Sequence, residues 1–210
     1  MSEPTDRGAF GEFADVSAGT LERFDRYAAL LRKWNPAINL VAPSTLDTLW
    51  SRHFLDSAAV FAARPANDGH WLDLGSGAGF PGLVVALLAA EKAPALTVTC
   101  VEADQRKAAF LRNVSRETGL AVTIAAQRIE DLPPQNADVI SARALAPLTR
   151  LLDHAAPHLT QGGVCLFPKG ARHAQEVEEA LAHWRFALET YPSPTDPESA
   201  ILKIGDLHRA

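Results

Sequence analysis

The chain has 210 residues and a formal net charge of −5, with 47% hydrophobic and 21% charged side chains. This length fits one domain of ordinary size with a substantial core. The longest apolar run, LVVALLAA, is far shorter than the roughly 20 residues of a membrane span. The polar start MSEPTDRGAF lacks the order of a signal peptide, so we expect a cytoplasmic protein with no membrane partner. The acidic balance does not indicate a general nucleic-acid binder, but a local basic patch would suffice.

The N-terminal third carries helical patterns. Residues 1–17 are mixed and contain glycine, which predicts a loose arm. Residues 18–33 repeat apolar side chains at helical spacing, with Thr20 as a candidate N-cap. The pair Asn35-Pro36 is expected to end this helix, because proline disfavours a helical conformation in the residue before it. A second helix is predicted to start at Ser44 or Thr45 and to run to the end of LDTLWSRHFLDSAAVFAA.

From residue 67 onward, short apolar runs alternate with helical patterns, which is typical of a parallel sheet with crossover helices. The predicted strands are 70–74, 95–103, 121–126, 137–144, 163–168, 185–191 and 199–204. The predicted helices are 81–90, 105–118, 146–158 and 173–183. The last two strands have only the turn-rich PSPTDPE between them and should form an antiparallel hairpin. We therefore expect an α/β domain over 67–210, with residues 1–66 as a helical extension packed on it in one compact unit.

The two cysteines, Cys100 and Cys165, lie singly in apolar runs. Neither has a second cysteine or a histidine at the spacing that zinc sites use. Such residues are usually buried in strands. The sequence therefore predicts two buried thiols and no metal site.

The segment WLDLGSGAGFPG joins the first predicted strand to the next helix. It holds four glycines, Gly75, Gly77, Gly79 and Gly82, and glycine lets the chain take positive φ and lets a ligand approach the backbone. In open parallel sheets, ligands bind at the carboxyl ends of the strands, beside this turn. The density of glycine therefore indicates a ligand site rather than a turn that merely packs the helix on the sheet.

Two ligands fit this segment. Residues 77–82 match the dinucleotide pattern G-x-G-x-x-G, and Glu102 follows at the distance expected for a ribose-binding carboxylate, as in a nicotinamide-dependent oxidoreductase. However, the first glycine of a dinucleotide fold ends its strand, whereas Asp73 stands at this strand's tip. The order D-x-G-x-G-x-G resembles motif I of the class I S-adenosylmethionine-dependent methyltransferases. In that reading, Glu102 would accept hydrogen bonds from the two ribose hydroxyls.

The segment after the fourth strand, ADVISARALAP, bears on the methyl acceptor. It contains neither the Asn/Asp-Pro-Pro-aromatic motif of amine methylation nor the cysteine that cytosine C5 methylation needs. It does place Arg143 at the ligand edge, either at the site or in a surface ion pair. Acceptors that need no such machinery remain, and guanine N7 is one, since its lone pair already lies in the plane of the ring.

The chain resembles the small-subunit (16S) ribosomal RNA guanine-N7 methyltransferases once named glucose-inhibited division protein B, over nearly its whole length. The segments that carry this resemblance are KWNPAINLVAPS, RHFLDSA, LDLGSGAGFPGLVVAL, VEADQRKAAFLRNV, RIEDL, ADVISARALAPL and FPKG. The resemblance implies a class I methyltransferase fold, a Rossmann-like seven-stranded sheet. It also implies methyl transfer from S-adenosylmethionine to N7 of one guanosine of 16S ribosomal RNA, presented naked or in an assembly particle. A methyltransferase acting on another acceptor stays open as an alternative.

The resemblance also implies a set of cofactor-binding residues. Gly75 would lie in the first turn, Phe80 would line the adenosine pocket, and Ile129 and Glu130 would border the adenine, Ile129 through its backbone. Superfamily logic adds Asp73 near the methionine ammonium group. The full expected set is Asp73, Gly75, Gly77, Phe80, Glu102, Ile129, Glu130 and Arg143.

Direct in-line displacement needs no general base, because N7 carries no proton, so no catalytic acid or base is assigned. Candidates for gripping RNA are the cationic or basic residues Arg32, Lys33, Arg52, His53, Arg143, Lys169 and Arg172. Lys169 would either hold a phosphate or be an exposed charge. His53, Asp56 and Ser57 share one helix face, which either covers the guanine pocket or only stabilises packing. No oligomeric partner is required.

Overall fold

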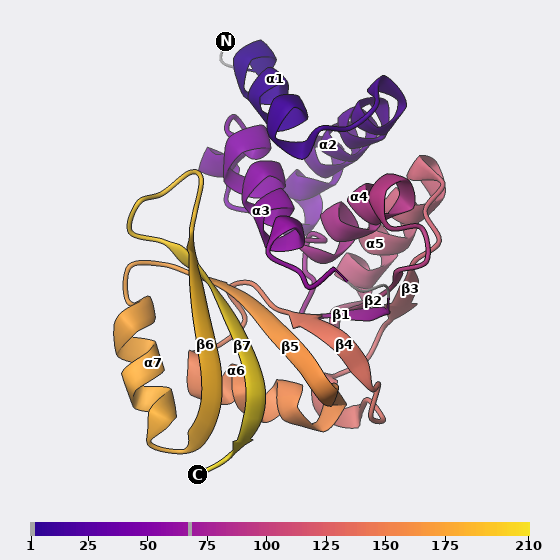
Figure 1. Cartoon of the computed structure of the whole chain (residues 1–210). Helices are drawn as coiled ribbons and strands as arrows, with labels where there is room; N and C mark the ends of the chain where they lie inside the picture. The colour runs from indigo at the N-terminus through magenta and orange to yellow at the C-terminus, as the bar shows by residue number, and fades with distance from the viewer. Residues whose placement is uncertain (1–2, 67–68) are drawn as a thin grey trace.

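The computed structural model describes residues 3–66 and 69–210, built around one seven-stranded sheet of order β3-β2-β1-β4-β5-β7-β6 (Figure 1). The strands are β1 His70–Leu74, β2 Thr97–Val101, β3 Thr123–Ala125, β4 Ala137–Ser141, β5 Leu159–Lys169, β6 Trp184–Pro192 and β7 Ala200–Arg209. Strands β1 to β5 pair in parallel, whereas β7 is antiparallel to both β5 and β6. The predicted α/β class, with its closing antiparallel hairpin, is confirmed.

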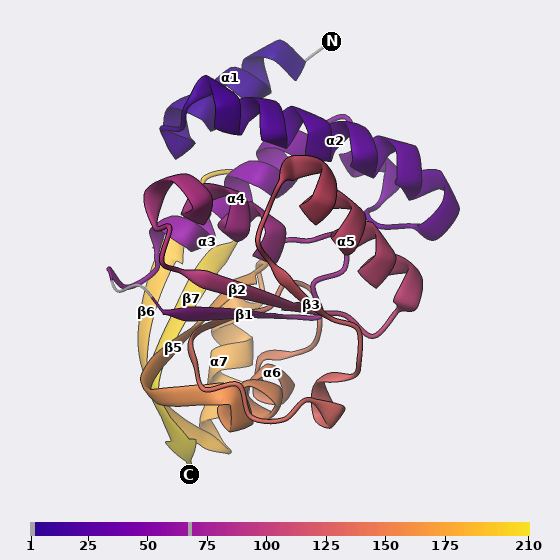
Figure 2. The same ribbon diagram turned by 90° about the vertical axis from the view of Figure 1, so that its right-hand side faces the viewer.

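Helices cover both faces of the sheet (Figure 2). One face carries α4 Gly82–Lys92 and α5 Gln105–Thr118, and the other carries α6 Leu148–Ala155 and α7 His173–Leu181. Because both faces are covered, the central strands read as nearly continuous apolar runs rather than as alternating ones. Among the described residues, none of the helices combines the length and the apolarity needed to cross a bilayer.

The N-terminal residues form a helix, α1 Glu3–Ala14, so the prediction of a loose arm was wrong. Phe10 is fully buried against Phe24, with ring centroids 4.7 Å apart, and it also packs on Trp50. Burial of one phenylalanine contributes about 2 kcal/mol. Tertiary packing therefore outweighs the low helix propensity of the glycines in this segment.

The next helix, α2 Ala18–Ile38, continues through Pro36, so the predicted stop at Asn35-Pro36 was wrong. Asn35 is buried, and its side-chain oxygen accepts a hydrogen bond from the Val41 N–H at 2.8 Å. The helix ends only at Asn39, which takes the left-handed conformation and bonds back to the Asn35 carbonyl. At the other end, Ser17 rather than Thr20 is the N-cap. The bonds made by Asn35 and Asn39 hold the last turn helical against the local preference of proline.

The second predicted helix is broken into three pieces. A 3-10 turn, η1 Pro43–Thr45, is followed by a π-helical turn, η2 Trp50–Leu55, and by α3 Asp56–Ala62. π-Helical turns are rare in proteins, and those that occur are often found at functional sites. Here the turn carries Arg52 and His53 to the carboxyl edge of the sheet.

Candidate functional site

Two cavities lie at the carboxyl edge of the sheet, on either side of residues 143–146, which we call the partition. The glycine-turn cavity, of about 640 Å³, is bordered by Gly75, Gly77 and Glu102. The basic cavity, of about 680 Å³, is lined by four cationic side chains, those of Arg52, Arg143, Lys169 and Arg172. The partition lines both cavities, so a group bound on one side lies next to a group bound on the other.

The glycine turn depends on three left-handed residues, with φ of +65° at Gly75, +56° at Gly77 and +93° at Gly79. A Cβ at Gly75 would lie 2.7 Å from Cδ1 of Leu145, in the partition. At Gly77, by contrast, the nearest atom to a Cβ is the Gly75 carbonyl oxygen at 3.8 Å. The missing side chain at Gly75 therefore lets Leu145 of the partition pack against the turn, whereas the space beside Gly77 stays open.

The amide groups of this turn are already used within the protein. The Gly77 N–H donates to Glu102 at 2.8 Å, and the Gly82 N–H donates to Asp73 at 3.2 Å. The Ser76 carbonyl accepts the N–H groups of Gly79 and Phe80. A pyrophosphate is held in dinucleotide folds by free amides at this turn and helix start. The described turn offers few of them.

Side chains of both charges border the glycine-turn cavity, three carboxylates and the cations Lys107, Arg128, Arg143 and Arg150. Glu102 follows β2 directly, and its two oxygens accept the N–H groups of Gly77 and Asp104, both at 2.8 Å. Each carboxylate oxygen has a second lone pair, so Glu102 can still accept from a ligand hydroxyl. Ile129 and Glu130 begin the short helix η3 Ile129–Asp131 and line the same cavity, as their predicted place requires.

Asp73 lies beneath the turn rather than at the cavity wall. It is fully buried, and its oxygens accept from Ser141 Oγ at 2.6 Å and from the Gly82 N–H. Burial raises its pKa to about 6, against hydrogen bonds that lower it. Asp73 thus bonds to the first residue of α4, and its expected contact with the methionine ammonium group stays a prediction.

Phe80 was expected to line the adenosine pocket, but it borders neither cavity. Its ring is buried between Tyr27 and His53, stacked on them with centroids 5.6 Å and 4.9 Å away. Tyr27 also donates a hydrogen bond to the carbonyl of Ala78 in the turn. The stack ties helix α2 and the π-helical turn to the glycine turn.

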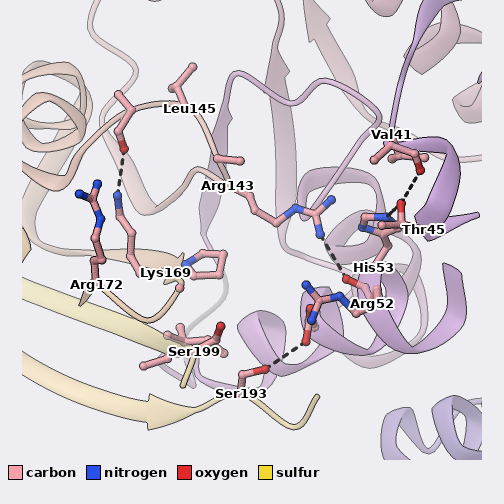
Figure 3. A pocket seen from close by; sticks show the side chains of 18 of the residues that line it. Val41, Thr45, Arg52, His53, Arg143, Leu145, Lys169, Arg172, Ser193 and Ser199 are labelled. Atoms are coloured by element: carbon pink, nitrogen blue, oxygen red, sulfur yellow. Dashed lines mark hydrogen bonds between the residues drawn. The ribbon is translucent and has the colours of Figure 1, made fainter. Parts of the chain in front are cut away.

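Arg143, the first partition residue, is half-buried and borders both cavities. Its guanidinium carbon lies 4.7 Å from the Phe80 ring centroid, and Nη1 donates to the Arg52 carbonyl at 3.5 Å (Figure 3). A cation over an aromatic face is attracted by the ring quadrupole. Phe80 thus acts on the site through Arg143, by supporting its guanidinium.

Lys169 is not an exposed charge, so that reading from sequence was wrong, and its contact with a phosphate stays a prediction. Its side chain is 9% exposed, and Nζ donates to the Ala146 carbonyl at 2.9 Å and to Glu176 at 2.7 Å (Figure 3). Glu176 also accepts the Leu148 N–H at 2.8 Å. This ion pair fastens the C-terminal end of the partition to β5 and α7.

His53 borders the basic cavity in its neutral form. Burial, with the nearby Arg143 and Arg52, lowers its pKa to about 3. Nε2 lies 2.9 Å from Thr45 Oγ1, whose own proton goes to the Ala42 carbonyl at 2.8 Å. The hydroxyl must therefore accept, so Nε2 carries the ring proton.

Sequence reasoning missed how remote segments complete the basic cavity. Asp56 accepts hydrogen bonds from the hydroxyls of Ser193, at 3.2 Å, and of Thr195, both in the loop between β6 and β7. Asn35 holds the chain so that Val41 borders the same cavity. The signals were present in the Asn-x-x-x-Asn-Leu and His-x-x-Asp-Ser segments, but pairing them with a loop more than a hundred residues away needed the tertiary structure.

The two cysteines are buried and free, and burial is the main cause that raises the pKa of each thiol, to about 12 for Cys165. Neither borders a cavity. Among residues 3–66 and 69–210, no three His, Cys, Asp or Glu side chains are grouped to hold a metal ion.

Comparison with known proteins adds a family. A family model described as rRNA small subunit methyltransferase G matches residues 20–195. A protein of that name from Cereibacter sphaeroides is 54% identical over 193 residues, covering 92% of this chain and 93% of its own. A namesake from Rhodospirillum centenum is 52% identical over 201 residues, covering 96% of this chain and 89% of its own.

Solved structures share the fold at low sequence identity. A ribosomal protein L11 methylase from Lactobacillus delbrueckii aligns with TM-score 0.57 and 16% identity over 76% of this chain and 78% of its own. A structure titled M. jannaschii TYW2 in complex with AdoMet aligns with TM-score 0.54 and 12% identity over 81% and 78%. The predicted class I methyltransferase fold is confirmed.

Proposed function

This chain belongs to the family of the rRNA small subunit methyltransferase G, and from that premise we propose that it transfers a methyl group from S-adenosylmethionine to N7 of a guanine in 16S ribosomal RNA. The donor would occupy the glycine-turn cavity and the guanine the basic cavity. The partition between them would bring the methyl group next to its acceptor.

The choice of donor rests on the hydrogen bonds that the amides of the glycine turn already make and on the side chains that border its cavity. Most of the turn's amides, among them those of Gly77, Gly79 and Gly82, are bonded within the protein. The cavity is bordered by three carboxylates, Glu102, Asp104 and Glu130, and by four cationic side chains, Lys107, Arg128, Arg143 and Arg150. The shortage of free amides disfavours a nicotinamide dinucleotide, whose pyrophosphate needs them, and Glu102 is suited to accept hydrogen bonds from ligand hydroxyls. S-adenosylmethionine has a ribose, an ammonium group and a sulfonium that supplies an activated methyl group.

The choice of acceptor is supported by what the basic cavity lacks. Its described lining has no asparagine and no cysteine, and the two thiols of the chain are buried elsewhere. In the reaction, N7 would form the new bond to the methyl carbon while the carbon–sulfur bond breaks and its electron pair stays on sulfur. No proton moves, so proximity and orientation supply the acceleration.

The residues of the chain would divide this work. Glu102 would accept hydrogen bonds from the ribose, while Ile129 and Glu130 would border the adenine. Arg143, at the boundary of the cavities, would lie near O6 of the guanine and leave N7 free. Arg52 and Arg172 would contact the phosphates beside the target.

Two measurements test the proposal. Calorimetry should detect binding of S-adenosylmethionine and none of NAD; the reverse result would contradict it. Small-subunit RNA from cells without the protein should lack one N7-methylguanosine, detected by mass mapping and by chemical cleavage at that base. Purified protein should then restore the mark. Restored methylation at a different atom would keep the donor and reject the acceptor.

A further inference from the structure

Asp56 has an unusual place in the basic cavity. It is the first residue of α3, it borders the cavity, and its Oδ1 is held by the hydroxyls of Ser193 and Thr195. Two hydroxyl donors on one oxygen fix the plane of the carboxylate. The side chain is therefore oriented before any ligand arrives.

The second oxygen, Oδ2, is available. No hydrogen bond to it is described, and it is absent from the fully buried polar atoms that lack partners within the described chain, so it keeps some exposure in a residue that lines the cavity. A held carboxylate with one open oxygen is suited to accept from a donor on a ligand.

The carboxylate of Asp56 also forms no ion pair within the described chain. The other carboxylate that lines this cavity, Glu176, is paired with Lys169 at 2.7 Å. Arg52 approaches Asp196 instead, at 4.0 Å. Burial raises the pKa of Asp56, while the hydroxyl bonds and the charges of Arg143 and Arg52 lower it.

Guanine has two edges that face different ways. N7 and O6 lie on one edge, while N1–H and the 2-amino group, both donors, lie on the other. If N7 faces the partition, the two donors face the wall formed by α3 and the loop 193–199. In Figure 3, Leu145 of the partition and Ser193 of that loop lie at opposite margins of the cavity.

We propose that Asp56 is a specificity-determining residue, which accepts hydrogen bonds from N1–H and the 2-amino group of the target guanine. This rests on the proposed function, since it concerns the base that is methylated. Arg143, whose guanidinium reaches the Arg52 carbonyl on the same helical stretch as Asp56, then donates to O6 while Asp56 accepts from the adjacent N1–H and the 2-amino group. Adenine would present its N1 acceptor to the carboxylate and be rejected, because a buried acceptor facing a carboxylate has no partner.

The test uses small-subunit RNA ligated from fragments, with either guanosine or inosine at the target. Inosine keeps N7, O6 and N1–H and lacks only the 2-amino group. With the wild-type protein, kcat/KM for methyl transfer should fall by about tenfold or more on inosine, the scale of one lost hydrogen bond to a charged group. In Asp56→Asn, transfer to guanosine should fall and the guanosine-to-inosine ratio should drop towards one.

Asp196→Asn is the matched control, because it makes the same chemical change in the loop outside the cavity lining. It should keep the wild-type ratio. A purely structural role for Asp56 predicts that Asp56→Asn slows both substrates equally, with the ratio unchanged, and that result would overturn the proposal.

A wild-type ratio near one also overturns it, and this measurement needs no variant. If Asp56→Asn does not fold by circular dichroism, Asp56→Ser serves for the same comparison. Failure of the proposed function would look different: the wild-type protein would not methylate even the guanosine target.

Discussion

The glycine-turn cavity and the basic cavity share a wall but are built in different ways. The first is lined by residues at the ends of parallel strands and by the segments that directly follow them. The second takes its lining from four separate stretches, 40–56, 143–147, 168–176 and 193–201. A parallel sheet places strand ends at one edge by its topology alone, whereas the basic cavity exists only after the N-terminal helices and the C-terminal hairpin have packed on the sheet.

The partition makes the two cavities depend on each other. It is held from the basic side by Lys169 and from the other side by the contact of Leu145 with Gly75. A change that loosens it should therefore affect both ligands, whereas a change at the outer rim should affect only one. Substitutions in the partition and at the rim test this difference.

Removal of Arg143 should have the largest effect on activity. Arg143→Ala should lower kcat/KM for methyl transfer by about 100-fold, the scale of losing one charge-stabilising donor at a reacting centre. Thermal stability should fall by no more than a few degrees, because the side chain is half-buried. Single-turnover rates and thermal melts measure the two. Losses of similar free energy in both would make Arg143 a structural residue and would weaken the view that the partition joins two ligand sites.

Breaking the ion pair under the partition should affect both cavities. Lys169→Ala leaves Glu176 without its cation, and Glu176→Gln leaves Lys169 without its anion, so each should cost about 2 kcal/mol of unfolding free energy. Affinity for S-adenosylmethionine and for RNA should both decrease. The double variant should lose less than the sum of the two single losses. Full additivity in urea titrations, or a change in RNA affinity alone, would contradict the coupling.

The unfolding free energy should depend on pH in opposite ways at His53, which borders the basic cavity, and at Asp73, which lies under the glycine turn. His53 has a pKa of about 3 in the folded protein, against an ordinary value of 6.5. Its contribution to the unfolding free energy is therefore fully present above pH 6.5 and is lost as the pH falls towards 3, because only the unfolded chain takes up the proton. For Asp73, with a pKa of about 6 against 3.8, the cost of burying the charge is absent below pH 3.8 and grows as the pH rises to 6. Between these values the two contributions oppose each other.

Substitution of His53 and substitution of Asp73 should therefore change the slope of unfolding free energy against pH in opposite directions. Relative to wild type between pH 4 and 6, His53→Gln should lose stability as the pH rises and Asp73→Asn should gain it, each by about 1 kcal/mol per pH unit. Urea unfolding at several pH values measures this. Tilts of the same sign would show that one of the two burial assignments is wrong.

The smallest effect is expected at the rim. Arg172 is exposed and borders only the basic cavity. Arg172→Ala should weaken RNA binding and reduce the slope of log affinity against log salt by about 1, the contribution of one phosphate contact. Affinity for S-adenosylmethionine should stay as in wild type. A fall in both affinities would mean that the rim and the cofactor side are not independent.

Much of the fold followed from local patterns. Alternating apolar runs predicted the strands, the short PSPTDPE link predicted the final hairpin, and the order of Asp73 and the glycines separated this turn from a dinucleotide turn. Each of these signals acts within a few residues, through backbone geometry or period, so one sequence is enough to see it. Glu102 was placed at the cavity by the same kind of signal, whereas Ile129 and Glu130 were implied by the family resemblance.

The remaining features depended on contacts between distant segments. The N-terminal arm became a helix because Phe10 packs on Phe24 and Trp50. Whether a charge is free or paired is decided in the same way. Nothing near Lys169 in the sequence showed that the fold pairs it with Glu176.

The sequence by itself thus determined the sheet and the glycine turn, since these depend on residues close together in the chain. The tertiary structure alone decided that Phe80 supports Arg143, that Asp73 lies under the turn, and that Asp56 is held by a loop from the far end of the chain. The physical reason is that burial and pairing are properties of packed surfaces, and those surfaces form only when the segments meet.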